Sequence, residues 1–204
     1  MKRRLVLAAL LCALPASGDQ ATLPPAAVIA LTPLDTLPAK SDIDNAFTPG
    51  PAVDNLIAIA RNAGADLRVA LHAIRMLPLY CSDAASCGTG TPIHDTLFAI
   101  IDDYARMLAT SPLPPPDLLR LRAAVEALGA THSGLSGDAG VLASPALLDH
   151  RSRDVRVTVV RALRVLGSCD AVNPLKRRNV NEPSPQVKVV IVAALQAFAL
   201  QCPP

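Results

Sequence analysis

The sequence predicts an all-α protein built as a solenoid of about four antiparallel helical pairs, and three observations lead to this prediction. A segment beginning at Asp149 recurs 32 residues later at Asn181, and internal repeats of this length are typical of solenoids. Each copy has a short polar turn, an apolar residue, a cation and an apolar run centred on Ala-Leu, at Ala162 and Ala194. No segment shows a convincing strand pattern.

The same frame extends towards the N-terminus. Ala73 and Ala124 each precede an apolar residue, and the four alanines of the frame are 51, 38 and 32 residues apart. In every copy another apolar residue follows at helical spacing; these residues are Leu77, Leu128, Leu166 and Phe198. We expect Pro78, Gly129 and Gly167 to end three of the helices. The extra length falls in residues 79–94 and 109–117, where surface insertions are tolerated.

Four helical pairs follow from this frame. They are residues 53–61 with 67–77, 96–108 with 118–128, 141–149 with 155–166, and 172–179 with 187–200. The proline run at 111–116 is expected to form a stiff connector. Residues 131–140 read as a Gly/Ser-rich loop. Valine runs at 155–160 and 187–192 resemble strands, but their place in the repeat favours buried helices.

The repeated segment resembles the HEAT-repeat family, including its short bacterial variants. The resemblance rests on Asp149 with Val155 and Arg156, and on Asn181 with Pro183, Val187 and Lys188. It covers residues 140–200 best, 117–130 less well and 51–78 least, since Leu67 replaces the expected cation there. The resemblance implies a right-handed α-solenoid in which the acid or amide and the cation seven residues later link the two helices of a repeat. An unrelated bundle of Ala/Leu-rich helices is the alternative.

The N-terminus has the pattern of a signal peptide over residues 1–18. A basic start precedes the apolar run from Leu5 to Ala16, which is too short to span a bilayer comfortably, and small residues follow it. A lipoprotein signal through Cys12 is disfavoured because Leu11 is bulky. We therefore expect export to the periplasm or the exterior, with no stable membrane span after signal removal. Residues 19–50 are predicted to be a Pro-rich linker or arm, and residues 51–204 the solenoid domain.

Charge is unevenly distributed along the expected mature chain. Residues 19–149 contain seven basic and fourteen acidic residues, whereas residues 150–204 contain nine basic and three acidic ones. The basic C-terminal part could bind an acidic protein partner, anionic lipid or a polyanion, or could be a solvated face with ion pairs between repeats. Nucleic acid is disfavoured by export and by the small number of aromatic residues, which are three Phe, two Tyr and no Trp.

The four cysteines beyond the signal peptide indicate disulfides. An even number of cysteines fits an oxidising compartment and leaves three possible pairings. Cys81 and Cys87 bracket a short loop and are expected to pair locally. Cys169 and Cys202 each follow the second helix of consecutive repeats, so stacking predicts a bridge that contributes roughly 2–4 kcal/mol. A metal site formed by Cys81, Cys87 and His94 is disfavoured because the usual closely spaced cysteine pairs are missing.

One polar row stands out in the repeat frame. Four residues occupy the position two after the conserved alanine of each copy, and Arg161 lies beside them; the row comprises Arg75, Glu126, Arg164 and Gln196. The second helices of a HEAT-like stack line its concave side, which commonly binds partners. The row is therefore either a partner-binding ridge or a ladder in which Glu126 pairs with Arg75 or Arg164.

The residues offer little support for catalysis. Ser136 lies between glycines but lacks the full nucleophile-elbow pattern, and the four histidines are scattered. Asp102 and Asp103 are adjacent, so they do not face each other on a helix. We expect no enzyme activity and no cofactor. The resemblance implies scaffold or adaptor function, with a structural subunit of an envelope complex or a HEAT-like lyase as alternatives.

Overall fold

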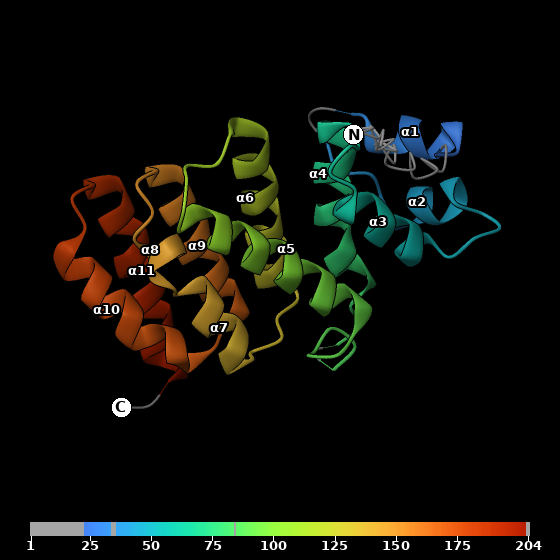
Figure 1. The fold of residues 1–204 in the computed structure, drawn as a ribbon. Coiled ribbons are helices and arrows are strands. Elements are labelled where there is room, and N and C mark those ends of the chain that lie inside the picture. Colours follow the sequence, from blue (N-terminus) through green and yellow to red (C-terminus); the bar gives the residue numbers. More distant parts are fainter. Residues whose placement is uncertain (1–22, 34–35, 84, 203–204) are drawn as a thin grey trace, which may run out of the picture.

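The computed structural model describes residues 23–33, 36–83 and 85–202, and all of its regular structure is helical (Figure 1). The predicted signal peptide, residues 1–18, lies outside the described residues. Two short 3-10 turns, Leu77–Tyr80 and Cys169–Ala171, accompany eleven α-helices in this part of the chain. The helices are α1 (Pro25–Leu31), α2 (Lys40–Ala46), α3 (Ala52–Arg61), α4 (Leu67–Met76), α5 (Pro92–Leu108), α6 (Pro115–Ala130), α7 (Ser136–Leu142), α8 (Pro145–Leu148), α9 (Arg153–Leu166), α10 (Val172–Asn181) and α11 (Pro185–Gln201).

The four predicted helical pairs correspond to α3 with α4, α5 with α6, α8 with α9, and α10 with α11, and the helices of each pair pack together. The single helix predicted over 141–149 is wrong, because α7 ends at Leu142 and Pro145 starts the separate, short α8. Proline begins several of the helices because its fixed φ suits the first helical position and its missing N–H has no partner there anyway. Pro115 and Pro116 therefore start α6 instead of belonging to the connector predicted over 111–116. The loop predicted over 131–140 is also too long, since α7 begins at Ser136.

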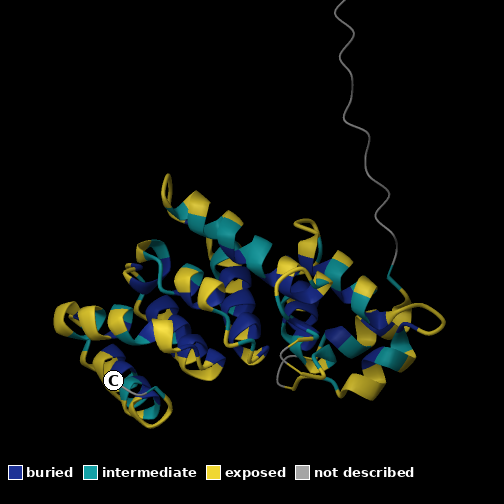
Figure 2. Ribbon diagram, turned by 90° about the horizontal axis from the view of Figure 1, so that it is seen from below, coloured by how far each residue is buried: buried dark blue, intermediate teal, exposed yellow. Residues whose placement is uncertain are grey.

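The second helices of the pairs form a continuous row. Helix α4 packs on α6, α6 on α9, and α9 on α11, while α3 packs on α5 and α5 on α7 and α8. Fully buried side chains lie along this row, among them Ile74, Leu128, Leu163 and Ile191. Figure 2 shows the resulting pattern, with buried residues facing neighbouring helices and exposed ones on the outer surfaces.

Residues 25–31 and 40–46 are helical, which differs from the extended arm predicted over 19–50. Helix α1 packs against α4 and α2 against α3, and the side chains of Leu31, Ile43 and Phe47 are buried in the core. The ring nitrogen Nδ1 of His72, on α4, lies 2.7 Å from the carbonyl oxygen of Leu31. These contacts cover the N-terminal end of the helical stack with apolar residues that the proline-rich composition obscured.

Helices α6 and α9 make the closest approach in the row. A Cβ atom at Gly129 would lie 2.7 Å from Cα of Ala162, so only glycine fits there without a shift of the backbone. Gly129 was predicted to end its helix, but α6 continues to Ala130 and the glycine serves helix packing instead. Gly167 does end α9, with the left-handed φ of 79° that favours glycine. Helix α4 ends just before Pro78 and continues as a 3-10 turn.

Both predicted disulfides are present. Cys81 pairs with Cys87 within one loop, and Cys169 pairs with Cys202 across the C-terminal pair of helices. The first bridge engages both sulfurs of the metal site considered above. Two disulfides fit a protein of an oxidising, extracytoplasmic compartment. Within the described ranges, no helix combines the length and hydropathy needed to cross a bilayer.

Replacing Gly129 with alanine is expected to lower the free energy of unfolding by about 1–3 kcal/mol, because the added methyl group overpacks the contact with Ala162. Gly140→Ala is the matched control: it is also helical but has no atom within 4 Å of the new Cβ, so it should be neutral or stabilising by up to about 1 kcal/mol. Urea unfolding of both variants measures the difference. Equal stabilities would contradict the close approach.

Candidate functional site

The predicted polar row begins with an ion pair between two helical pairs. Arg75 on α4 and Glu126 on α6 lie 3.1 Å apart between Nη2 and Oε2, and Arg75 Nε donates to the same oxygen at 3.1 Å. This contact agrees with the ladder interpretation for these two residues. Both side chains are more than one-third exposed, so the pair contributes little to stability and mainly orients Glu126.

A shallow groove of about 300 Å³ lies between α6 and α9, next to this pair. Arg122 Nε donates to Thr158 Oγ1 at 3.4 Å across it. Its wall combines apolar side chains with charges of both signs; the lining residues are Arg122, Glu126, Ala130, Asp154, Val157, Thr158, Arg161, Ala162 and Val165. Ala162, which meets Gly129 at the close contact of the two helices, is one of these lining residues.

The structure gathers only part of the predicted row at this groove. Arg161 and Glu126 line it, and Arg75 joins it through Glu126. Arg164 is exposed on the same helix as Arg161 but outside the groove, and Gln196 is exposed farther along on α11. Among the described residues, neither Arg161 nor Arg164 forms an ion pair, so both guanidinium groups are available to an external acid.

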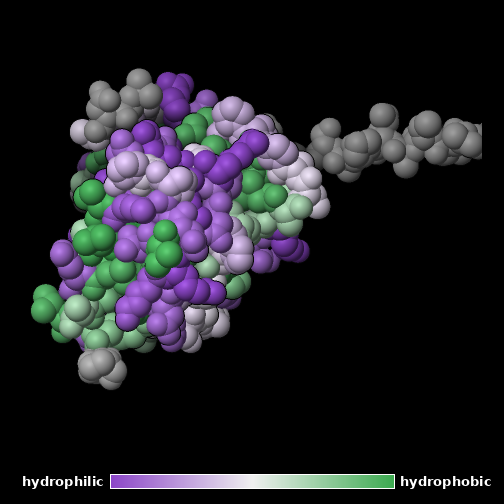
Figure 3. Space-filling model, turned by 90° about the vertical axis from the view of Figure 1, so that its left-hand side faces the viewer, coloured by the Kyte–Doolittle hydropathy of each residue, from purple (hydrophilic) through white to green (hydrophobic). Residues whose placement is uncertain are grey.

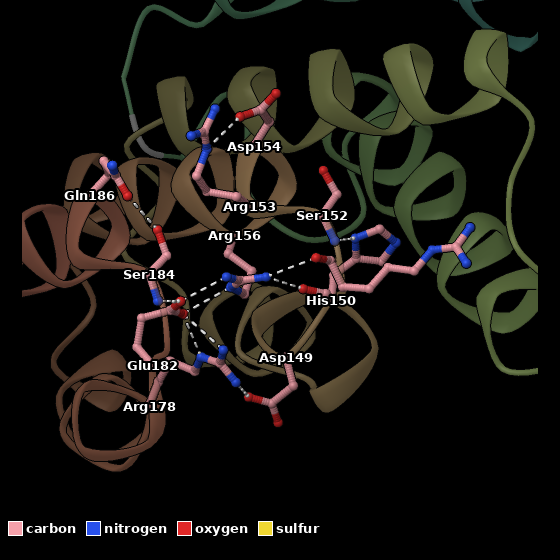
Figure 4. Close-up of polar contacts among 11 residues, drawn as sticks. Asp149, His150, Ser152, Arg153, Asp154, Arg156, Arg178, Glu182, Ser184 and Gln186 are labelled. Carbon is pink, nitrogen blue, oxygen red and sulfur yellow. Dashed lines mark hydrogen bonds and ion pairs between the residues drawn. The ribbon is translucent and has the colours of Figure 1, made fainter.

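A buried polar cluster joins the third and fourth helical pairs (Figure 4). The guanidinium of Arg156 donates to Glu182 at 2.7 and 2.8 Å, and its third nitrogen donates to the carbonyl oxygens of His150 and Arg151 at 2.7 and 3.1 Å. Arg156 is 5% exposed and Glu182 2%. The predicted link between Asp149 and Arg156 is therefore replaced by a contact to the next repeat.

Asp149 has a different partner from the one expected. Arg178, on α10, donates to Asp149 at 2.7 Å and to Glu182 at 2.9 Å, so it bridges the two turns. In the second copy of the motif, Asn181 donates to the carbonyl oxygen of Arg177 at 3.3 Å, and Lys188 is exposed. The sequence analysis missed Glu182 and Arg178. The sequence signal that could have identified Glu182 was a carboxylate in the interhelical turn, one residue after the expected amide of Asn181.

The surroundings of Glu182 keep its carboxylate ionised. Burial alone would raise its pKa, but hydrogen bonds from Arg156, from the N–H of Ser184 and from Arg178 lower the pKa to about 2. The two-arginine arrangement satisfies the carboxylate almost completely, which buried charges require. This cluster fixes how α10 and α11 sit on α9 and thereby shapes the C-terminal part of the molecule.

Arg120 performs a comparable task in the N-terminal half and was also missed. Its side chain on α6 is 6% exposed and donates to the carbonyl oxygens of Asn62, Ala63 and Ala65 at 3.0 to 3.2 Å. These carbonyls belong to the turn between α3 and α4, where the oxygen of Asn62 also accepts a hydrogen bond from the N–H of Ala65. A buried arginine thus ties α6 to the preceding pair.

A third buried cluster contains His94, Asp138 and Ser133. His94 Nε2 lies 2.8 Å from Asp138, and its Nδ1 lies 2.9 Å from Asp95. Ser133 donates to the other oxygen of Asp138. The carboxylate lies between serine and histidine, so the imidazole does not accept the serine proton as a nucleophile would need. The cluster instead joins the start of α5 to α7.

Comparisons of the chain with protein-family models, with curated proteins and with solved structures found no match.

Glu182→Gln is expected to destabilise the protein by about 3 kcal/mol at neutral pH, since it leaves Arg156 buried without its full counter-charge. Because the folded pKa of Glu182 is about 2, below the ordinary glutamate value of 4.5, its contribution is complete above pH 4.5 and is lost as pH falls towards 2. Thermal unfolding at pH 2–7 measures both effects. The exposed Asp170→Asn variant is the control, and an equal acid response in both variants would exclude this role for Glu182.

Stability should also decline on the alkaline side. Burial lowers the pKa of His94, but hydrogen bonds with Asp95 and Asp138 outweigh it and raise the pKa above 6.5. Its contribution is therefore complete below pH 6.5 and is lost as pH rises through the folded pKa. His94→Asn should abolish this pH dependence of the melting temperature. His132→Asn should retain it, since His132 is exposed and its positive φ suits asparagine.

Proposed function

We propose that the chain is an exported, non-catalytic module for protein–protein interaction, built as a right-handed HEAT-like α-solenoid. The succession of packed second helices from α4 through α6 and α9 to α11 supports this architecture. The 32-residue internal repeat supports it as well, because it gives α9 and α11 equivalent places in the row. The disulfides support exposure to an oxidising compartment, as export through residues 1–18 would provide.

The observation that carries the functional proposal is the groove between α6 and α9. It offers apolar surface at Val157 and Val165 beside the unpaired guanidinium of Arg161. Guanidinium groups bind carboxylates with two parallel hydrogen bonds and lose little on partial desolvation. A protein segment with an acidic residue next to an apolar one would therefore suit this surface. Arg164, exposed one turn away on the same helix, extends the positive charge.

A non-catalytic role agrees with the chemistry of the polar clusters. Arg156, Glu182 and Arg178 satisfy one another, and Ser133 is held by a carboxylate instead of a base. Each cluster joins two helices and lies beneath the surface. Their role is to hold the row of helices in a fixed arrangement, which is what a binding scaffold needs.

The double variant Arg161→Glu/Arg164→Glu is expected to lose the partner without unfolding, because both side chains are exposed and unpaired. Affinity capture of the tagged mature protein from its own cell envelope, followed by mass spectrometry, identifies what co-purifies. We expect at least a tenfold loss of the captured partner. Arg151→Glu/Arg177→Glu is the matched control: both arginines are exposed, lie outside the groove and form no ion pair among the described residues. This variant changes the net charge equally and should retain the partner.

Two results would argue against this function. One is a partner that both double variants capture equally well, which would place its site elsewhere. The other is a clean monomer with nothing bound under conditions in which the protein is naturally produced. Circular dichroism of each variant shows whether the fold persists, so that unfolding is not mistaken for lost binding.

A further inference from the structure

Helix α11 exposes an unusually apolar surface at the end of the stack. From Val189 to Leu200 the sequence contains one polar residue, Gln196, and no charge. Three of its large apolar residues are open to solvent: Val189 is 70% exposed, Val192 42% and Leu200 90%. Figure 3, which views this end of the molecule, shows hydrophobic surface beside hydrophilic surface. A helix that is apolar on all sides is usually covered on all sides.

The internal repeat identifies which residues of α11 a neighbour would cover. Val192 is the equivalent of Val160, 32 residues earlier, and Val160 on α9 is fully buried. Likewise Leu195, which is half-buried, is equivalent to the fully buried Leu163. Helix α9 carries the next helical pair, whereas α11 carries none in the described structure. Val192 is thus exposed, and Leu195 half-buried, at positions that are fully buried where a further pair is packed.

The same comparison indicates that a neighbour packed on α11 would carry an acidic residue. Lys188 is the equivalent of Arg156, whose guanidinium reaches the carboxylate of Glu182 in the turn of the following pair at 2.7 Å. Lys188 is exposed and pairs with no carboxylate among the described residues. Lys176 and Arg177 are also exposed, on α10 of the same end. A partner that placed a carboxylate beside Lys188 would reproduce the contact that Arg156 makes inside the molecule.

A shallow groove of about 470 Å³ extends this surface towards α10. Leu195 and Phe198 contribute its apolar side, Lys176 its charge, and the Cys169–Cys202 bridge closes one end. The disulfide ties the end of α11 to the 3-10 turn Cys169–Ala171, which precedes α10. The surface is therefore held in place before any partner arrives, which lowers the entropic cost of binding.

A second copy of this chain fits the surface poorly. The first helical pair, which could otherwise continue the stack, is covered by α1 and α2. A symmetric contact between two α11 faces would place the basic residues Lys188, Lys176 and Arg177 of both copies at one interface. Like charges at an interface disfavour association.

We propose that the exposed face of α11 binds a helical hairpin of another protein, with an apolar face and a carboxylate in its interhelical turn. The hairpin would pack as an additional pair, covering Val192 and Leu195 and pairing with Lys188. This inference rests on the proposed role as an interaction module, but it uses a different surface from the groove at Arg161.

The chain itself supplies a defined probe. Appending a second copy of residues 171–202 directly after Cys202 preserves the 32-residue register, and Ser replaces the final Cys to avoid a free thiol. The appended pair should dock on α11 with its Glu182 beside Lys188. We expect a monomer whose melting temperature is higher than that of the original chain by about 5 °C, with an appended segment that resists protease.

Charge exchange tests the specific contact. Lys188→Glu in the original helix should remove most of this gain, as should Glu182→Lys in the appended copy alone. Combining the two should restore it. Lys188→Glu in the chain without the appended copy should leave the melting temperature unchanged, because the lysine there has no partner.

Three outcomes would overturn the proposal. They are an appended segment cleaved as readily as an unfolded tail, a stability gain indifferent to charge exchange, and an original chain that sediments as a dimer dispersed by Val192→Asp. The test is independent of the groove: Arg161→Glu/Arg164→Glu should leave the gain in melting temperature intact. A docked appended pair without any partner at the groove would therefore reject only the function proposed above.

Discussion

The guanidinium of Arg156 lies between two turns of the chain, and the arrangement of the last two helical pairs depends on it. It donates to carbonyl oxygens of the turn before its own helix and to Glu182 in the turn of the following pair. Two buried charges in this position are costly unless every donor and acceptor is used. Here Arg178 and the N–H of Ser184 complete the shell around Glu182, so the contact specifies one relative placement of α9 and α11.

The inner row of helices uses small residues for a related purpose. Gly129 and Ala162 permit α6 and α9 to approach closely, and Arg120 and Arg156 hold turns on either side of this contact. The apolar faces of the helices are buried by close packing, while the arginines donate hydrogen bonds to carbonyl groups of the turns. The side chains on the surface above this contact take no part in the packing or in the hydrogen bonds to the turns. Arg161 is consequently available for binding, on a support that the core keeps rigid.

The two ends of the stack differ in a way that bears on function. At the N-terminal end, α1 and α2 cover the first pair and His72 contacts the backbone of Leu31. At the C-terminal end, α11 keeps the apolar residues of an internal helix but has no neighbour on its far side in the described structure. A stack of this kind needs a polar outer face at each end to remain soluble by itself. The two ends of the stack therefore expose different amounts of apolar surface.

The helical class, most of the paired helices and both disulfides were predictable from the sequence, because these depend on local periodicity and on the repeat at 32 residues. Helix ends were less predictable where one residue type serves two purposes, as with Gly129, which resembles a stop signal but permits a close approach. The N-terminal helices escaped detection because prolines recur in the segments that flank them, although Leu31 and Ile43 become core residues.

Only the tertiary structure decided which charges meet. The acid and cation of the repeat motif, Asp149 and Arg156, are seven residues apart in the sequence, yet each binds a residue of the following pair. Sequence spacing constrains contacts along one helix, whereas contacts between helices depend on how their axes and turns are placed. For the same reason the residues of the predicted polar row differ in their contacts. Arg75 forms an ion pair with Glu126, whereas Arg161 and Arg164 form none among the described residues.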